Sequence, residues 1–356
     1  MIFAAGGDPL TREVHVGEYF EWLFGVIRDY VFYRGDDAVH KLILMLIAIA
    51  LFVVVMGAIL WLVDRPKRIP GWVVAAGFVG PAVLALLFGL VYPALLTING
   101  SFKDRTGAEY IGWGNYEVAF TNPAFQAVLR NTALWVLLVP LLSTFIGLVY
   151  AVLVDRTRFE RIAKTLIFMP MAISMVGASI IWRLVYDARQ SGDDQTGLMN
   201  QLLVLVGVEP FDPRLTTPPI NTLFLIVVMI WIQTGFAMTV LSAAIKAIPD
   251  DIVEAAKLDG LTGLEMFRFI TVPSIRPALV VVLTTIAMGT LKVFDIVRTM
   301  TGGQFETSVV ANEFYVQAFR QNNQGLGAAL AVLLFVIIIP IIIYNIRQMR
   351  LSEEIR

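Results

Sequence analysis

The chain alternates between long apolar runs and short polar connections. Crossing the hydrocarbon core of a bilayer takes about 20 consecutive, mostly apolar residues, and seven stretches reach that length. They cover residues 42–63, 72–96, 132–154, 164–186, 221–245, 278–299 and 326–346. Each is expected to be an α-helix, because lipid offers no water to satisfy backbone polar groups. The pattern predicts an all-α, polytopic membrane protein with seven transmembrane helices.

The segment before the first run has a different pattern. Residues 17–34 are rich in aromatic side chains but also contain acidic and basic ones. This mixture favours an amphipathic helix at the membrane interface, with an eighth span as the alternative. Residues 1–16 lack the basic start and apolar centre of a signal peptide, so no cleavage is expected.

Composition supports the membrane prediction and excludes other classes. Hydrophobic residues make up 58% and charged residues 15% of the chain, whereas soluble domains carry about 25% charged residues. Mean hydropathy is +0.76. A net charge of -1 provides no basic surface for nucleic acid. With no cysteine, and only His15 and His40 as histidines, no metal site is predicted.

Basic residues set the expected orientation. Lys and Arg are denser in one alternating set of connections, which comprises residues 64–71, 155–163, 246–277 and 347–356. The positive-inside rule places this set in the cytoplasm. The C-terminus is then cytoplasmic, and seven spans place the N-terminus outside.

The longest cytoplasmic connection, residues 247–277, has the pattern of two short helices. Pro249 ends the preceding helical register. Asp251 is placed to cap a new helix, with Glu254 as its capping-box partner, and Gly260 is placed to end that helix.

A second helix in this connection would be capped by Thr262 with Glu265 and closed by Val272-Pro273. The first helix has a face of small residues flanked by acids, which suits insertion into another protein's groove. The alternative from the residues alone is a solvated loop with ordinary caps.

This connection resembles the EAA loop of ABC importer permeases. The matching positions are Glu254-Ala255-Ala256, Asp259-Gly260, Phe267, Ile270, Val272-Pro273 and Pro277. Val272 stands where leucine is usual, and Leu261 follows the glycine where alanine is frequent. In that family the loop contains the coupling helix, which docks in a cleft of the ATPase subunit. The resemblance implies an ATPase contact made by Asp251, Glu254, Ala255, Ala256, Asp259 and Gly260.

Other segments resemble the maltose-type carbohydrate branch of that family. They are Gly112-Trp113-Gly114-Asn115-Tyr116, Asn131-Thr132 at the start of the third span, and Thr301-Gly302-Gly303. The resemblance runs from about residue 72 to the C-terminus. It implies a six-helix core of the type I importer class, with an additional N-terminal span as in the larger maltose-type subunit.

The resulting division has four parts. Residues 1–40 form an external N-terminal segment, 41–70 the additional helix with its basic loop, 71–350 the ABC importer transmembrane domain, and 351–356 a cytoplasmic tail.

The resemblance also implies partners. A second homologous permease, two ATPase subunits and an external solute-binding protein would complete an importer that works by alternating access in the bacterial inner membrane. The external connections 97–131, 188–219 and 300–324 would meet the binding protein.

Catalytic motifs are missing from the sequence. There is no G-x-x-x-x-G-K-[ST], no nucleophile elbow and no H-E-x-x-H. We therefore expect a non-catalytic subunit without a bound cofactor, with ATP and Mg used by the partner ATPase.

Polar and aromatic residues within the spans are candidates for the substrate pathway, because buried polar groups in membranes usually face a cavity or a protein interior. The candidates are Trp231, Gln233, Thr234, Met238, Thr285, Gly289, Lys292 and Asp295. Packing is the alternative for each of them. Lys292 and Asp295 are expected on one helical face, where they could pair.

The segment 292–304 resembles permeases for α-glucosides, which implies maltose, trehalose or maltodextrin as substrate. Glycerol phosphate or a monosaccharide is the alternative solute. A stand-alone secondary transporter is the rival class, and it would need an ion-coupling site near the midplane.

Overall fold

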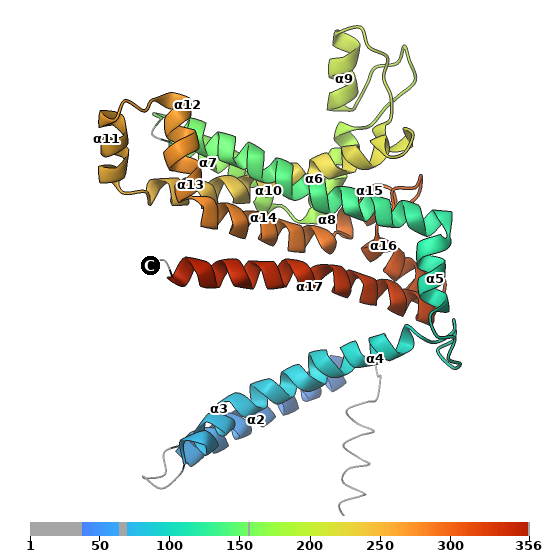
Figure 1. The fold of residues 1–356 in the computed structure, drawn as a ribbon. Coiled ribbons are helices and arrows are strands. Elements are labelled where there is room, and N and C mark those ends of the chain that lie inside the picture. Colours follow the sequence, from blue (N-terminus) through green and yellow to red (C-terminus); the bar gives the residue numbers. More distant parts are fainter. Residues whose placement is uncertain (1–37, 64–69, 156, 355–356) are drawn as a thin grey trace, which may run out of the picture. The chain divides into compact units, whose positions relative to one another are not determined.

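The computed structural model describes residues 38–63, 70–155 and 157–354 (Figure 1). The predicted interfacial helix at 17–34 lies outside these residues, as does most of the basic loop at 64–71. Within the described ranges the chain forms helices joined by turns and loops, and its only β pairing is an isolated bridge between Lys103 and Tyr110.

The chain divides into two compact units, Met1–Tyr92 and Pro93–Arg356. In the first unit, α2 (Ala38–Val63) and α3 (Gly71–Leu86) are long apolar helices, and α3 continues into a π-helical turn, η1 (Leu87–Val91). Most of the described apolar side chains of this unit are exposed on the protein surface, as expected for helices that face lipid.

The remaining elements follow in chain order. They are α4 (Tyr92–Gly100), α5 (Gly114–Thr121), α6 (Pro123–Val154), α7 (Glu160–Phe168), η2 (Met169–Ala172), α8 (Met175–Val185), α9 (Leu198–Leu205), η3 (Pro213–Leu215), α10 (Ile220–Lys246), α11 (Asp250–Leu258), α12 (Gly263–Met266), η4 (Phe267–Thr271), α13 (Val272–Ser274), α14 (Arg276–Leu291), α15 (Asp295–Met300), α16 (Val310–Tyr315), η5 (Val316–Arg320) and α17 (Gln324–Glu354).

The number of spans agrees with the sequence. Among the described residues, 5 helices are long and apolar enough to cross a membrane. Two further pairs pass the same test but are bent, by 104° between η2 and α8 and by 69° between α13 and α14. Counting each bent pair as one span gives up to 7, which confirms the predicted all-α, polytopic architecture.

The third and fourth spans differ in shape from the straight helices expected at 132–154 and 164–186. Helix α6 already begins at Pro123, because the Asn122 side chain accepts a hydrogen bond from the Ala124 N–H at 2.9 Å and proline favours a first helical position. The fourth span is broken after η2. Ser174 starts α8 anew by accepting a hydrogen bond from the Gly177 N–H at 3.0 Å.

Helices α6 and α10 form the centre of the second unit. Trp135 and Val139 of α6 and Leu225 and Met229 of α10 are fully buried in one apolar cluster. Contact is close because small residues lie at the crossing, as is common between helices in membranes. Helix α14 packs against α6 and α17 beside this pair.

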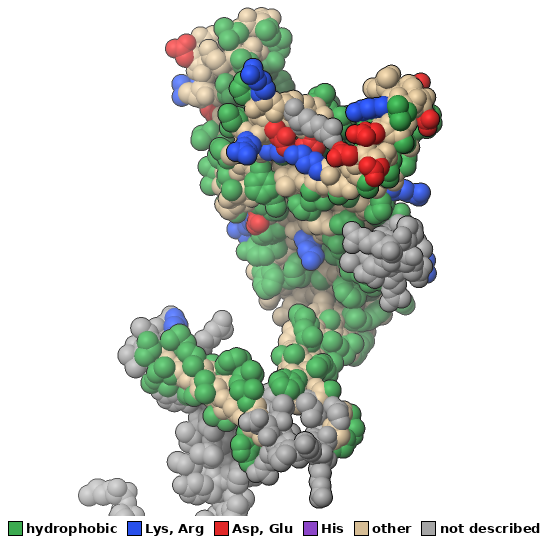
Figure 2. Space-filling model, turned by 90° about the vertical axis from the view of Figure 1, so that its left-hand side faces the viewer, with side chains coloured by type: hydrophobic (Ala, Val, Ile, Leu, Met, Phe, Trp, Pro, Cys, Tyr) green, Lys and Arg blue, Asp and Glu red, His purple; other side chains and the backbone are tan. Residues whose placement is uncertain are grey.

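The two ends of this unit differ in character. Helices α11 and α12 and the C-terminal end of α17 lie at one end, and α5 and α16 lie at the other (Figure 1). The described parts of the connections 155–163 and 247–277 therefore share an end, as the charge pattern predicts. Figure 2 looks at that end and shows acidic and basic side chains gathered on it.

Candidate functional site

The coupling-loop helix α11 has clear start and stop signals. It begins at Asp250 with Pro249 as the N-cap residue, so the expected side-chain cap from Asp251 is wrong. Asp250 and Asp251 instead lie in the first turn, where acids interact favourably with the helix dipole.

The end of α11 follows the sequence prediction. Gly260 has φ +86°, and its N–H donates to the Lys257 carbonyl at 3.0 Å. The Leu261 N–H donates to the Ala256 carbonyl at 3.0 Å. This pair of bonds is a Schellman motif, which needs a left-handed residue at the glycine position.

Most of α11 is accessible to a partner. Of the residues predicted to contact an ATPase, only Ala256 is buried, while Asp251, Glu254, Ala255, Asp259 and Gly260 are exposed. Large apolar side chains lie beside them. Leu258 is 88% exposed and Leu264 78% exposed, although both lie at the polar end of the molecule.

The second helix of the loop is longer than predicted. It runs through α12, η4 and α13 and includes Val272-Pro273, which were expected to close it. Pro273 is tolerated because the preceding turn is π-helical, and the chain bends only at Ile275, before α14. The second helix of the loop therefore leads into α14 through a 69° bend.

An ionic network joins three helices next to this loop. The Lys164 Nζ lies 2.6 Å from Asp155 Oδ1 and 2.8 Å from Glu160 Oε1. Ser242 of α10 donates a hydrogen bond to Asp155 Oδ1 at 2.7 Å and also contacts Lys164 Nζ. Lys246, the last residue of α10, pairs with Glu160.

The position of this network gives it functional interest. It connects the C-terminal end of α6, the start of α7 and the end of α10, and the coupling loop follows Lys246 directly. The Asp155 side chain is only 9% exposed, so removing its cation would leave a largely buried charge without compensation. This network was not predicted from the sequence, because Ser242 is 87 residues from Asp155 along the chain and Lys246 is 86 residues from Glu160.

The candidate pathway residues of α14 share one side of the helix. Thr285 and Gly289 are four residues apart and both exposed, and Lys292, just past the helix end, is exposed too. Thr284, the neighbour of Thr285, lies on a different side of the helix, is buried and accepts a hydrogen bond from the Asn345 amide of α17. The spacing of four places Thr285 and Gly289 on one accessible side of α14.

The candidates on α10 divide into two groups. Trp231 and Gln233 are half-buried, and the Trp231 ring packs edge-on against Trp182 with centroids 5.8 Å apart. Thr234 and Met238 are buried in the helix packing. Thr234 donates its hydroxyl to the Ile230 carbonyl at 2.7 Å, so it has no free donor for a substrate.

Lys292 and Asp295 do not lie on one helical face. Helix α14 ends at Leu291, and α15 begins at Asp295 after a non-helical break, so the expected pairing of the two side chains is wrong. No ion pair joins them in the described part of the chain. Asp295 is half-buried, whereas Lys292 points to the surface.

Metal binding has no support in the described ranges. No group of three or more His, Cys, Asp or Glu side chains there is arranged to hold an ion. The chemistry available at the sites above is hydrogen bonding, ion pairing and apolar contact.

Comparison with known proteins gives consistent results. The chain is 47% identical over 272 residues to an alpha-glucoside transport system permease protein of Rhizobium meliloti, which covers 76% of this chain and 81% of that protein. It is 44% identical over 279 residues to an osmoprotective compounds uptake permease protein of Synechocystis, covering 78% of this chain and 100% of the relative.

A solved structure shares the fold. It is a bacterial ABC transporter involved in the import of the acidic polysaccharide alginate, with a TM-score of 0.67 and 22% identity, covering 78% of this chain and 95% of the matched one. Residues 118–351 match the family described as binding-protein-dependent transport system inner membrane component. This chain, with its type I importer fold, belongs to that family of ABC importer permeases.

Proposed function

We propose that the chain is the permease subunit of an ATP-driven importer for short α-glucosides such as maltose, trehalose or maltodextrin. The observation that carries this proposal is the 47% identity, over 272 residues, to an alpha-glucoside transport permease. Uptake of an osmoprotective compound is the second candidate, favoured by the 44% identity over the whole length of that relative.

The coupling loop supports a separate source of energy. Helix α11 docks in a cleft of an ATPase subunit, with Leu258 and Leu264 as apolar anchors and Glu254 and Asp259 at the rim. The anchors are 88% and 78% exposed in the single chain, and burying them would supply a favourable contact. The chain itself is non-catalytic, and ATP and Mg are used by the two ATPase subunits.

The pathway is shared with a second, homologous permease. The stripe of Thr285, Gly289 and Lys292 faces outward from the single chain, so a partner is needed to enclose it. Trp231 and Gln233 of α10 contribute an aromatic face and an amide, which suit a sugar ring and its hydroxyl groups. Asp295 lies at the break above α14, where it can accept hydrogen bonds from the substrate.

Alternating access follows from the connections of the coupling loop. Movement of α11 is delivered to α14 through the continuous helix Gly263–Ser274. It reaches α6 and α7 through Lys246 and the ionic network with Glu160, Lys164 and Asp155. The bends near residues 173 and 275 are the places where the spans can change angle.

Transport by the intact complex tests the proposal. The chain is purified with its partners from native membranes in mild detergent and reconstituted in liposomes with ATP inside. Uptake of radiolabelled trehalose and maltose is compared with uptake of glycerol 3-phosphate. We expect the α-glucosides to be accumulated and an ATPase and a second permease to copurify. A chain that comes out alone and still moves solute would overturn the importer assignment.

The coupling contact has its own test. Gly260→Pro introduces a residue whose φ is fixed near −65°, far from +86°, and it removes a donor of the Schellman motif. We expect this variant to lose the ATPase during purification. Retention of the ATPase at the wild-type ratio would refute the docking of α11.

Orientation is also proposed, with the C-terminus cytoplasmic and the N-terminus external. Because the sequence contains no cysteine, a single Thr157→Cys substitution provides a unique label in the connection 155–163, where Thr157 is exposed and lies outside the proposed ATPase contact. We expect a membrane-impermeant maleimide to reach it only in inverted vesicles.

A further inference from the structure

The loop between α15 and α16 has an unusual backbone. Phe305 and Glu306 are consecutive non-glycine residues with φ of 56° and 55°. Non-glycine residues populate this left-handed conformation roughly tenfold less often than the right-handed one, or more rarely still. Gly302 and Gly303 nearby are also left-handed, but glycine adopts this conformation freely. The strain at Phe305 and Glu306 therefore has to be held by contacts.

Two buried asparagines supply those contacts. The Asn131 side-chain amide donates to the Glu306 carbonyl at 2.5 Å and to the Ser308 carbonyl at 3.1 Å. The Asn221 side-chain amide donates to the Phe305 carbonyl at 2.6 Å. Both asparagines are 0% exposed. Each is followed by a threonine near the start of its span, one in α6 and one in α10.

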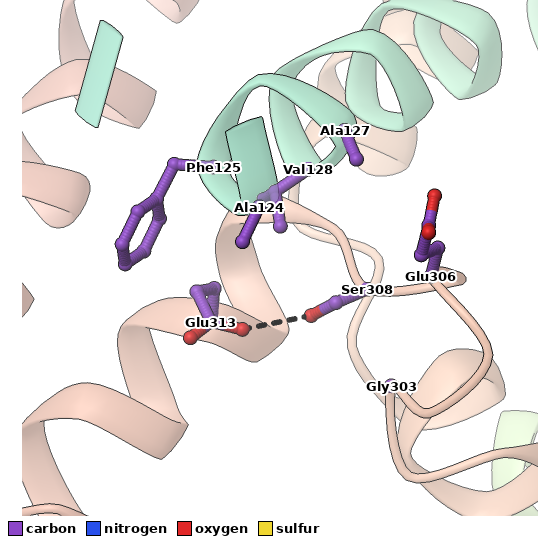
Figure 3. A pocket seen from close by; sticks show the side chains of 8 residues that line it. All are labelled: Ala124, Phe125, Ala127, Val128, Gly303, Glu306, Ser308 and Glu313. Atoms are coloured by element: carbon purple, nitrogen blue, oxygen red, sulfur yellow. Dashed lines mark hydrogen bonds between the residues drawn. The ribbon is translucent and has the colours of Figure 1, made fainter. Parts of the chain in front are cut away.

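These hydrogen bonds from Asn131 and Asn221, here called the clamp, turn the carbonyl groups of Phe305 and Glu306 inward and leave the two side chains exposed. Phe305 is 49% exposed, and Glu306 is exposed as well. Figure 3 shows the Glu306 side chain projecting from the loop, away from the hydrogen bond between Ser308 and Glu313. A hollow of about 610 Å³ lies beside it, lined by Glu306 together with Pro123, Gln126 and Arg130 of α6.

The loop itself is closed by further bonds. The hydroxyl groups of Thr301 and Thr307 lie 2.6 Å apart, and Thr307 donates to the Gln304 carbonyl at 2.7 Å. The Val310 N–H donates to the Thr132 hydroxyl at 3.0 Å. The exposed Phe305 ring contributes little to folding stability. Because the loop that carries it is already held in place, little conformational entropy is lost when a partner binds the ring.

From this arrangement we propose that Phe305 and Glu306 form a preformed contact for the external solute-binding protein, and that Asn131 and Asn221 are the positioning residues that hold it. The inference rests on the proposed function, since it needs a binding-protein-dependent importer. The loop lies at the end of the unit opposite the coupling helix α11 (Figure 1), where that protein must dock. The exposed acidic side chain of Glu306, beside Gln126 and Arg130 at the rim of the hollow, suits a soluble protein partner better than the hydrocarbon of a bilayer.

The clamp also connects this contact to the transport machinery. Asn131 and Asn221 lie on α6 and α10, the two central helices, whose other ends carry Asp155 and Lys246 of the ionic network. Helices α6 and α10 are therefore joined to the loop at one end by the two asparagines and to each other at the other end by the ionic network, which lies next to α11. Docking at the loop would act on this helix pair.

The test measures ATP hydrolysis by the complete complex in nanodiscs as its trehalose-loaded binding protein is titrated. Phe305→Ala is expected to raise the half-saturating concentration about tenfold, as for an aromatic anchor of an interface. Asn131→Ala is expected to do the same. Adding Glu306→Gly to Asn131→Ala should recover part of the loss, because glycine needs no clamp to be left-handed.

Controls separate this role from a purely structural one. Ser143→Ala changes another fully buried polar residue of α6, one without a hydrogen-bond partner, and should leave the titration unchanged. Glu306→Gly alone sets the ceiling for recovery. If Asn131→Ala does not assemble, Phe305→Ala decides, since its side chain is half-exposed.

A wild-type half-saturating concentration in Phe305→Ala overturns the inference. So does a loss in Asn131→Ala that is larger than the loss in Glu306→Gly alone and that the added Glu306→Gly does not reduce. A wild-type complex that the binding protein does not stimulate would refute the proposed function instead.

Discussion

The close contact of α6 with α10 allows a quantitative prediction. A Cβ added at Gly147 would lie 2.6 Å from the Ala237 Cβ and 2.7 Å from the Met238 backbone nitrogen. Non-bonded carbon atoms prefer separations of about 3.5–4.0 Å, so the two helices would have to move apart by about 1 Å. Neither obstructing atom can rotate away, because one is backbone and the other a Cβ.

The expected cost follows from two opposing terms. Alanine is favoured over glycine inside a helix by about 0.8–1 kcal/mol. Overpacking a well-packed interior costs about 1–3 kcal/mol. Gly289, inside α14, has nothing within 4 Å of an added Cβ and gains only the first term. The difference in stability between Gly147→Ala and Gly289→Ala is therefore expected to be about 1–3 kcal/mol, with Gly147→Ala the less stable.

Thermal unfolding of the purified chain in mild detergent, followed by size-exclusion fluorescence, measures this difference. Gly147→Val should unfold at a still lower temperature, because a branched side chain adds atoms on the same side. Equal midpoints for Gly147→Ala and Gly289→Ala would refute the reasoning, since they would mean that α6 and α10 are not in close contact at this point.

Three further predictions concern the sites. Gly260→Ala adds a Cβ in open space at φ +86°, so it should destabilise the end of α11 by about 1 kcal/mol through backbone strain alone. We expect less sugar to be transported per ATP hydrolysed, and an unchanged ratio of sugar to ATP would contradict a coupling role. Lys164→Met leaves Asp155 without its closest cation and should destabilise the chain by about 1–3 kcal/mol. Lys246→Met should cost less, because the Lys246 side chain is 49% exposed, and the reverse order of thermal midpoints at low and high salt would contradict the observed ionic network. Thr285→Val keeps the shape of the exposed Thr285 side chain but removes its hydroxyl, so half-maximal uptake should need a higher sugar concentration while the ATPase still copurifies normally. An unchanged dependence of uptake on sugar concentration would show that Thr285 does not line the pathway.

Local features of the coupling loop could be predicted from the sequence. The stop at Gly260 depends on residues within one helical turn, and proline and glycine limit the backbone wherever they occur. The predicted N-cap, Asp251, is two residues past the observed one, Pro249, because Asp250 and Asp251 are both favourable in a first turn. The break of the fourth span was missed for a different reason, since apolar composition alone cannot distinguish a straight span from a bent one.

The sequence by itself determined the all-helical class and, within the described residues, the places of the seven apolar segments, because hydropathy and backbone hydrogen bonding in lipid act over about 20 neighbouring residues. Only the tertiary structure decided which polar residues meet. Asn131 and Asn221 donate hydrogen bonds to a loop that lies far along the chain. Asp155 contacts Lys164 and Ser242, and a break between helices places Lys292 and Asp295 apart. Such contacts depend on how helices cross and where they end, which arises from packing between distant segments and leaves no periodic signal along the chain.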